Sequence, residues 1–276
     1  MNIKTQNFIK QNTSFQRSQI VSFLLLLSGL VIILSPLIIV LYTSFFSYSN
    51  NPSFTFKYYQ EAWEKGNFLL GFTNSSIVAI AVTIFQVITS ILAGYALARL
   101  EFRGKNIVLL LILATLVIPF QILVIPIFLI LKSGNLINTY WALILPTAAS
   151  GFGIFLMRQY FSTIPIELEQ AATLDGANTL QIIWYILFPL AKPAIITLSL
   201  FTFIGEWNDL FKPLVFTNNP NLITVQLSLA SFQEQFTSNW SLLMAAVIIA
   251  TIPVIILFII GQKQFIEGIG TTGIKN

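Results

Sequence analysis

Long apolar runs without a charged residue constrain the fold of this chain more than any other feature. Residues 20–46, 107–131 and 242–262 contain no Asp, Glu, Lys or Arg. As an α-helix, each run is long enough to cross the hydrocarbon core of a bilayer, which takes about 20 residues. Lipid offers no hydrogen-bond partners to the backbone, and a membrane barrel would show short alternating segments instead of continuous runs. The sequence therefore predicts an all-α polytopic membrane protein.

The composition supports this class and excludes several chemistries. Of the 276 residues, 56% are hydrophobic and 9% are charged, whereas a soluble domain carries about 25% charged residues. The chain has no cysteine and no histidine, which excludes disulfides, thiolate nucleophiles, histidine bases and the usual zinc or haem ligands. We predict no catalytic residue, no metal site and no nucleic-acid partner, and we attribute the net charge of +4 to loop topology.

Six transmembrane helices account for the hydropathy of the chain. We expect them near residues 20–46, 73–98, 107–131, 140–158, 190–211 and 242–262. The first run is too long for the apolar part of a signal peptide, and no small-residue cleavage site follows it, since the first alanine is Ala62. The transmembrane domain thus covers residues 20–262, between an N-terminal segment, 1–19, and a C-terminal tail, 263–276.

The distribution of lysine and arginine predicts the orientation. Ten of the 14 lie in one set of segments, namely Lys4, Lys10, Arg17, Arg99, Arg103, Lys105, Arg158, Lys192, Lys263 and Lys275. The other segments carry Lys57, Lys65, Lys132 and Lys212. Because positively charged loops stay on the cytoplasmic side, we predict that both termini and the loop 159–192 are cytoplasmic. The outer loops, near 47–72 and 212–241, are aromatic and polar, which indicates interfacial anchoring or a partner-binding surface.

The large loop between the fourth and fifth spans predicts a helical hairpin. Pro165 suits the first turn of a helix, and Glu167 and Glu169 complement the positive end of its dipole. Gly176 is placed to end this helix in a left-handed conformation. Asn178 or Thr179 can then cap a second helix.

The second helix of the hairpin predicts an apolar stripe of Leu180, Ile183, Trp184 and Leu187. Pro189 and Pro193 should break it before span five. In the first helix, Ala171, Ala172 and Gly176 form a ridge of small residues that permits close approach by another protein. The alternative is a hairpin that only covers the end of the bundle.

Polar residues within the spans are the candidates for a solute path. Ser76, Thr83, Gln86 and Ser90 form one stripe along span two, and Gln121 lies between two prolines in span three. Such groups would suit sugar hydroxyls in a hydrated path. The alternative is hydrogen bonding between spans, at about 1 kcal/mol or less per contact.

Two acids lie near the outer half of span five. Glu206 and Asp209 are spaced i,i+3 with Asn208 between them, and Lys212 follows one turn later. Acids within a membrane are functional candidates, here for an outer gate. We favour the alternative, a paired and hydrogen-bonded helix end.

The hairpin carries a recognisable motif. "ELEQAATLDGA" followed by "ILFPLAKPA" resembles the loop signature of permease subunits of bacterial ATP-binding-cassette importers. That signature reads E-A-A, three residues, G, about nine residues, then I-x-L-P. Ala171, Ala172 and Gly176 match it, Gln170 stands where the family has the glutamate, and Phe188 stands where it has leucine.

The resemblance extends over roughly residues 20–276 and is to the carbohydrate-uptake branch, in particular the second permease of the maltose importer. It is also carried by the segments "GNLINTYWALILP", "GIFLMRQYF", "EWNDLFKPLVF", "MAAVIIATIPVIILF" and "QKQFIEGIGTTGIKN". The resemblance implies a multi-pass subunit of the bacterial inner membrane that works by alternating access. Its partners would be a second permease, two ATPase subunits and an extracytoplasmic solute-binding protein.

By the same resemblance, the first hairpin helix is a coupling helix that docks in a groove of the ATPase. Its candidate contact residues are Glu167, Glu169, Gln170, Ala171, Ala172, Asp175 and Gly176. The tail from Gly268 to Lys275 would also reach the ATPase pair. The chain has no G-x-x-x-x-G-K-[ST] sequence, and its nearest fragment is Gly104-Lys105-Asn106. ATP and magnesium would therefore bind the partner subunits, and this chain would bind no cofactor and be no enzyme.

Three other interpretations remain open at this point. An ion-coupled transporter acting alone would need carboxylates near the midplane and repeated broken helices. A membrane scaffold would not need the hairpin. An importer of a solute other than a sugar, such as a glycerol phosphate, would call for basic residues in the spans.

Overall fold

The fold is entirely helical over the residues that the structure describes. The computed structural model describes residues 3–46, 53–235 and 239–270. Apart from an isolated antiparallel bridge between Phe46 and Phe54, the regular structure in these ranges is helix. The chain divides into two compact units, unit 1 with residues 1–62 and 236–248, and unit 2 with residues 63–235 and 249–276.

Unit 1 contains the predicted first span. Helix α1 runs without interruption from Ile3–Phe45, so the predicted N-terminal segment continues the helix of the span. Most of its side chains from Val21 onward are exposed and apolar. Phe45 packs against a cluster of aromatic rings, Phe54, Phe56 and Tyr59. Tyrosine, here Tyr59, is typical of the bilayer interface, where its ring is apolar and its hydroxyl meets water.

Three helices are long and apolar enough to cross a membrane among the described residues. They are Val21–Phe45 in α1, α3 (Phe68–Arg99) and Trp240–Lys263 in α14, which itself extends over Trp240–Gly270. Helix α14 thus runs into the predicted C-terminal tail. Residues 271–276, including Lys275, lie outside the described residues.

Three further apolar segments consist of two helices with a bend between them. The first is α4 (Lys105–Thr115) and α5 (Phe120–Ser133), bent by 102°. The second is α6 (Tyr140–Ile144) with η1 (Leu145–Thr147), followed by α7 (Gly151–Thr163), bent by 45°. The third is α9 (Thr179–Gln181), η2 (Ile182–Leu187) and α10 (Phe188–Leu190), followed by α11 (Lys192–Trp207), bent by 81°.

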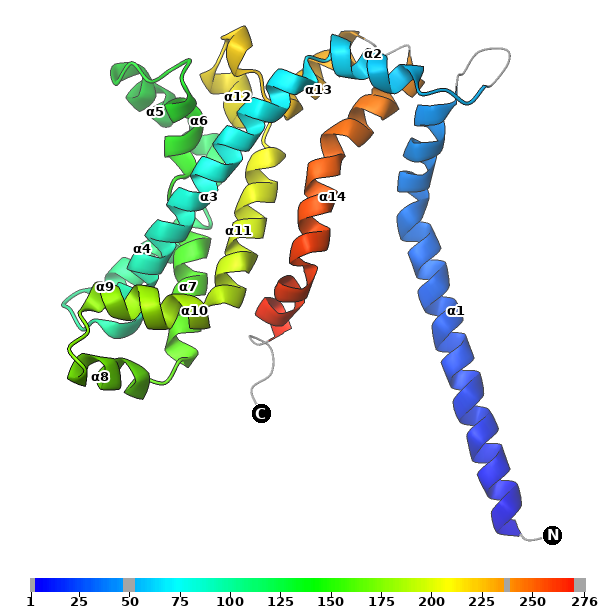
Figure 1. The fold of residues 1–276 in the computed structure, drawn as a ribbon, viewed down its shortest axis with the longest axis horizontal. Coiled ribbons are helices and arrows are strands. Elements are labelled where there is room, and N and C mark those ends of the chain that lie inside the picture. Colours follow the sequence, from blue (N-terminus) through cyan, green and yellow to red (C-terminus); the bar gives the residue numbers. More distant parts are fainter. Residues whose placement is uncertain (1–2, 47–52, 236–238, 271–276) are drawn as a thin grey trace. The chain divides into compact units, whose positions relative to one another are not determined.

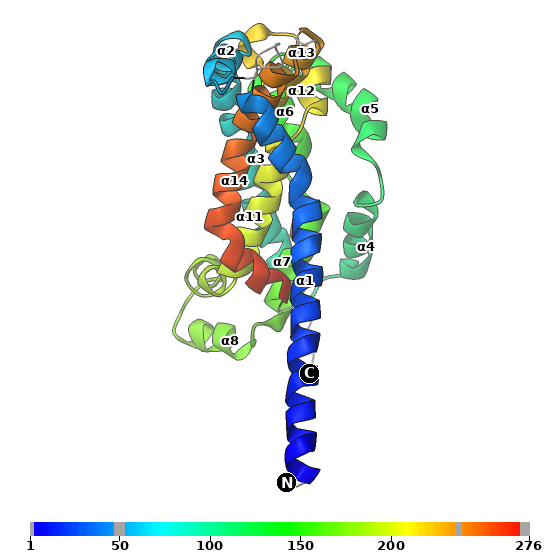
Figure 2. The same cartoon turned by 90° about the vertical axis from the view of Figure 1, so that its right-hand side faces the viewer.

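The prediction of one continuous helix over 107–131 is wrong. Helix α4 ends at Thr115, and Pro119 adopts an extended conformation before α5 begins. A proline has no N–H to donate and disfavours helical conformation in the residue before it. Figure 2 shows the consequence within unit 2, with α4 and α5 on one side of the unit and far from collinear.

The predicted boundaries of spans four and five are also corrected. The segment 140–158 breaks at Ala148–Ser150, and α7 continues five residues further, to Thr163. Helix α11 ends at Trp207 rather than at residue 211, so Asp209 lies in the turn before α12 (Phe211–Phe216). Pro213 lies inside that short helix.

The two ends of unit 2 carry different elements (Figure 1). Helix α8 (Glu167–Leu174) and α9 lie at one end, together with the C-terminus of α3 and the start of α4. The opposite end carries α5, α12 and α13 (Val225–Gln235), with the short η3 (Pro220–Leu222) between the last two. Arg99, Arg103 and Lys105 thus lie at the α8 end.

Helix α7 packs closely against α3 and α4 through glycines. A Cβ at Gly94 of α3 would lie 2.7 Å from Met157 Cβ and 2.9 Å from the Arg158 nitrogen of α7. At Gly151 it would lie 2.7 Å from the Thr115 hydroxyl of α4. Small residues let membrane helices approach closely enough for extensive van der Waals contact. The core beside this crossing contains Ile91, Tyr95, Met157, Phe161, Ile164, Ile182, Ile183, Leu187, Ala191, Ala194, Ile195 and Leu198.

Candidate functional site

The hairpin predicted from the sequence forms as two helices, α8 and the segment Thr179–Leu190, which we call the 167–190 hairpin. Gly176 follows α8 with φ of 87°, a left-handed conformation that glycine adopts without strain. The Asn178 side chain accepts from the Gln181 nitrogen, and the Gln181 side chain accepts from the Asn178 nitrogen. This capping box satisfies two backbone donors at the helix start. The predicted stop at Gly176 and cap at Asn178 are confirmed.

The predicted apolar stripe of the second helix is only half correct. Ile183 and Leu187 are buried, but Leu180 and Trp184 are exposed, and Ile182 is buried instead. The reason is the π-helical winding of Ile182–Leu187, which widens the turn. Pro189 accounts for this winding, because its ring clashes with the carbonyl four residues earlier in a regular α-helix. The predicted break before span five is confirmed by the 81° bend after Leu190.

The predicted contact residues of α8 divide between an outer and an inner face. Those that are exposed are Glu167, Gln170, Ala171, Asp175 and Gly176. Ala172 is half-buried and packs on the core, so the predicted ridge of small residues is open only at Ala171 and Gly176. Leu174 is 89% exposed. Leu174 was not among the predicted contact residues, although an apolar side chain between the polar residues Thr173 and Asp175 was the available signal.

Glu169 lies on the inner face of α8 and is buried. Its carboxylate accepts from Arg99 Nε at 2.5 Å, and Arg99 Nη2 donates to the Ile164 carbonyl at 2.7 Å. Beside this ion pair is a cavity of about 450 Å³, whose lining includes Tyr95, Gln170 and Thr179. Sequence reasoning missed the pair because Arg99 precedes Glu169 by 70 positions. The only feature of the sequence that pointed to this pair was that Arg99 and Glu169 were both predicted on the cytoplasmic side.

Gln86 of the predicted polar stripe connects three helical segments. Its Nε2 donates to the Thr147 carbonyl at 2.7 Å, and its Oε1 accepts from the Thr202 hydroxyl at 2.8 Å. The Thr89 hydroxyl, at 3.3 Å, contacts the Ala148 carbonyl. Side chains of α3 therefore satisfy carbonyls that the break between α6 and α7 leaves free, as a broken span in lipid requires. This arrangement fits the alternative of hydrogen bonding between spans.

The remaining stripe residues differ in their surroundings. Ser90 is fully buried opposite Gly153, and its Oγ has no hydrogen-bond partner among the described residues. Ser76 and Thr83 are half-buried. Gln121 is exposed in the first turn of α5, directly after the 102° break. The structure therefore does not bring the five candidate path residues together around one space.

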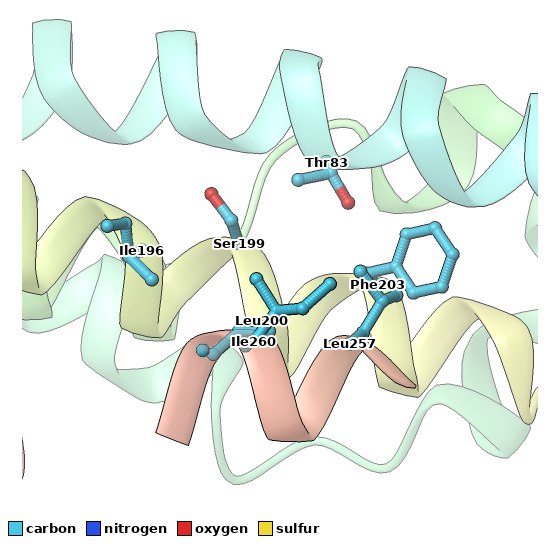
Figure 3. Close-up of a pocket in the computed structure, with 8 residues that line it drawn as sticks. Thr83, Ile196, Ser199, Leu200, Phe203, Leu257 and Ile260 are labelled. Atoms are coloured by element: carbon cyan, nitrogen blue, oxygen red, sulfur yellow. The ribbon is translucent and has the colours of Figure 1, made fainter. Parts of the chain in front are cut away.

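Thr83 borders an apolar cavity of about 330 Å³ (Figure 3). Thr83 of α3 and Ser199 of α11 lie on one side, and Leu257 and Ile260 of α14 on the other. The hydroxyls of Thr83 and Ser199 donate to carbonyls of their own helices, at 2.7 and 2.8 Å. The cavity therefore presents mainly apolar side chains, and neither hydroxyl needs a further acceptor.

Lys212 is the centre of a buried ion cluster with both predicted acids. Its Nζ contacts Glu206 Oε2 and Asp209 Oδ2, at 2.5 and 3.3 Å, and donates to the Thr147 hydroxyl at 2.7 Å. The other carboxylate oxygen of Asp209 accepts from the backbone nitrogens of Phe211 and Lys212. The predicted pairing is confirmed. Asn208 lies at the exposed edge, where it accepts from Gln226.

Comparison with known proteins adds to this geometry. A family model described as "Binding-protein-dependent transport system inner membrane component" matches residues 87–270. The chain belongs to this family. The matched range contains the 167–190 hairpin, the Lys212 cluster and both bent helix pairs between α4 and α7.

Individual relatives cover most of the chain. It is 34% identical over 212 residues to the arabinooligosaccharides transport system permease protein AraQ of Halalkalibacterium halodurans, covering 77% of this chain and 76% of that protein. It is 33% identical over 198 residues to the sn-glycerol-3-phosphate transport system permease protein UgpE of Yersinia pestis, covering 71% and 70%. A crystal structure of a bacterial ABC transporter involved in the import of the acidic polysaccharide alginate superposes with a TM-score of 0.80, at 27% identity, covering 91% of this chain and 98% of that one.

The chain is therefore an inner-membrane permease subunit of an ATP-binding-cassette importer, whose ATPase activity lies on separate subunits. The helical fold is that of such permeases. This assignment decides against a transporter that acts alone by ion coupling and against a passive scaffold, because the family depends on a binding protein. No group of three or more acids that could hold a metal ion occurs within the described parts of the chain.

Proposed function

We propose that this subunit forms, with a second permease, the translocation path for a sugar or sugar-like solute, and that the 167–190 hairpin couples this path to ATP hydrolysis on two partner subunits. One observation carries the coupling role. A short helix of eight residues, α8, stands at the end of unit 2 with an exposed face and a buried face. Such a helix can contact a partner on one side and move the bundle on the other.

The exposed face of α8 supplies the proposed ATPase contacts. Glu167, Gln170, Ala171, Asp175 and Gly176 are exposed there, next to the apolar side chain of Leu174. Ala171 and Gly176 allow a close backbone approach, and Leu174 gains from burial in a groove. ATP-driven closure of the partner subunits would then favour one state of the path, because the hairpin contacts differ between the two states.

The proposed topology has six spans, with both termini and the hairpin in the cytoplasm. With each of the three bent pairs forming one span, the three long helices and the bent pairs would make six crossings, and the lysine and arginine distribution supports the orientation. The binding protein would then approach the end of unit 2 that carries α5, α12 and α13. Helix α14 continues to Gly270 and would lead the C-terminal tail toward the ATPase pair.

The break between α4 and α5 is the proposed point where this chain borders the solute path. Irregular backbone at membrane depth is tolerated only where protein buries it or where it lines a water-filled cavity. Gln121 follows this break with an exposed amide. Its donor and acceptor groups suit the hydroxyls of a sugar.

A sugar is the preferred solute class, and a glycerol phosphate is the second candidate. The relatives named for arabinooligosaccharides and alginate support the first, and the relative named for sn-glycerol-3-phosphate supports the second. Lys212, which is buried near the α12 end of unit 2, is already paired with two acids. The positive charge of Lys212 is therefore already compensated, which disfavours the binding of a phosphate group at this site.

Reconstitution tests this function. The cognate binding protein is screened by thermal shift against oligosaccharides, sugar alcohols and glycerol phosphates, and the stabilising solute is used for uptake into proteoliposomes that hold both permeases and the ATPase. We expect a sugar to raise the melting temperature and ATP-dependent uptake of that sugar. Uptake without the ATPase subunit would contradict the proposed coupling, and stabilisation by glycerol phosphates alone would contradict the solute class.

A further inference from the structure

We infer that Glu169 and Arg99 act as a clamp that fixes the coupling hairpin to span two, so that movement of α8 reaches α3 directly. This inference rests on the proposed coupling function, but it gives Glu169 a different part in it. Glu169 would be a positioning residue inside the subunit rather than a contact of the ATPase.

The guanidinium of Arg99 joins three elements. Arg99 is the last residue of α3, its Nε contacts Glu169 in the first turn of α8, and its Nη2 donates to the carbonyl of Ile164. Ile164 directly follows α7. One side chain therefore fixes the end of α3, the end of α7 and the start of α8 relative to one another. The planar fork of arginine is suited to two such bonds, which a lysine could not reproduce.

The clamp lies away from solvent, and this strengthens it. The side chains of Arg99 and Glu169 are 11% and 7% exposed. An exposed ion pair contributes little to a fixed geometry, whereas a buried pair that loses one partner leaves an uncompensated charge. The Lys105–Glu101 pair at the same end of unit 2 provides the contrast, because its glutamate is 89% exposed.

Adjacent residues of α8 lie on opposite faces of the helix and have different roles. Glu169 points to Arg99, and Gln170 is exposed on the outer face. The inner face continues through Ala172, and Ala177 lies in the turn after α8; both pack on the core cluster that includes Tyr95 and Phe161. Movement of α8 is thus passed through an ion pair and apolar packing to α3, and the close crossing at Gly94 carries α7 along.

Transport stoichiometry in the assembled importer tests the clamp. Both permeases, the ATPase and the binding protein are reconstituted, and solute uptake, ATP hydrolysis and the amount of bound ATPase subunit are measured together. The variants are Glu169→Gln, Arg99→Lys, the charge swap Arg99→Glu with Glu169→Arg, and Glu101→Gln as the matched exposed control. For Glu169→Gln we expect wild-type ATPase binding, ATP hydrolysis within about twofold, and about tenfold less solute per ATP.

The other variants test the clamp through the same ratio of solute to ATP. Arg99→Lys should give an intermediate ratio of solute to ATP, the swap should restore most of the wild-type ratio, and Glu101→Gln should leave it unchanged. A wild-type ratio in Glu169→Gln would overturn the clamp. So would loss of the bound ATPase subunit in that variant, because Glu169 would then be a direct contact.

Two further outcomes separate the clamp from the proposed function. If Glu169→Gln does not accumulate as folded protein, the swap decides alone, since a restored ratio supports the clamp and a low ratio in a folded complex rejects it. If the wild-type chain never holds an ATPase subunit, the proposed function fails and the clamp fails with it.

Discussion

The Gln86 side chain donates a 2.7 Å hydrogen bond to the carbonyl of Thr147, at the point where η1 ends and α7 has not yet begun. The Lys212 ammonium donates to the hydroxyl of the same threonine. Thr147 therefore links Gln86 of α3 to the ion cluster at the end of α11. A helix break inside an apolar segment is held by side chains that lie far away in the sequence.

Replacement of Gln86 by leucine should destabilise the subunit. The Thr147 carbonyl and the Thr202 hydroxyl would both lose a partner in a buried site, at about 1–3 kcal/mol for each unsatisfied group. We expect a lower midpoint of thermal unfolding in detergent. Gln121→Leu is the matched control, because Gln121 is exposed, and it should leave the midpoint unchanged. Equal midpoints for the two variants would reject a structural role for Gln86.

Replacement of Lys212 by methionine should destabilise the fold more strongly. Removal of one partner from a buried ion cluster typically costs about 3–5 kcal/mol, and here Glu206 and Asp209 would remain uncompensated. Chemical unfolding of the purified subunit measures the loss. Adding Glu206→Gln and Asp209→Asn to Lys212→Met should recover much of it. A triple variant as unstable as the single one would show that charge compensation is not the cause.

The same acids test the outer-gate alternative. With Lys212 intact, Glu206→Gln and Asp209→Asn should lower stability, while the transport rate of the folded complex stays close to wild type. The structure favours this outcome because both carboxylates are paired with Lys212, and the Asp209 carboxylate also accepts from two backbone nitrogens. Uptake that fails in a complex of normal stability would instead favour a gate.

Gly94→Ala should weaken the crossing of α3 and α7. The new Cβ would lie 2.7 Å from Met157 Cβ and 2.9 Å from the Arg158 nitrogen, so the two helices would have to separate. Overpacking of this kind costs about 1–3 kcal/mol. Gly205→Ala in α11 meets nothing within 4 Å and should be neutral or slightly stabilising, because alanine favours the helix. Thermal unfolding of both variants compares them, and a neutral Gly94→Ala would contradict the close packing.

Gly176→Val should uncouple ATP hydrolysis from uptake. The glycine is exposed and has φ of 87°, so valine both strains the turn and blocks close approach to α8. Gly104→Val is a matched control, since Gly104 has φ of 85° and also meets nothing within 4 Å. Both variants should show a similar strain of about 1–3 kcal/mol, but only Gly176→Val should lose uptake per ATP. Equal uptake in the two would weaken the docking role.

Local interactions between neighbouring residues were sufficient to predict the hairpin from the sequence. Gly176 and Asn178 act through their own backbone and their nearest neighbours, so the stop of α8 and the cap of the next helix could be predicted. The break at Pro119 was hidden by its surroundings, because hydropathy is equally high on both sides of it. A bent apolar segment and a straight apolar helix have the same composition, so the hydrophobic pattern could not show that this segment is bent.

The sequence pattern could not predict which residues far apart in the chain contact each other. Glu169 was predicted to complement the helix dipole and, from the family resemblance, to contact the ATPase, and neither expectation points to a partner inside the subunit. Its partner Arg99 is brought to it by the crossing of α3 and α7. Gln86 was likewise recognised as a polar residue within a span, but its contact with Thr147 depends on a break that had not been predicted.

The most direct test of the coupling role is cross-linking from α8 to the ATPase. The chain has no cysteine of its own, so single cysteines can be placed at Ala171 on the exposed face of α8 and at Asn218, exposed at the opposite end of unit 2. Each variant is assembled with its partners and treated with a short thiol-to-amine cross-linker. The Ala171→Cys variant should form an adduct with the ATPase subunit, and the Asn218→Cys variant should not. An adduct from Asn218→Cys, or none from Ala171→Cys in an intact complex, would contradict the account.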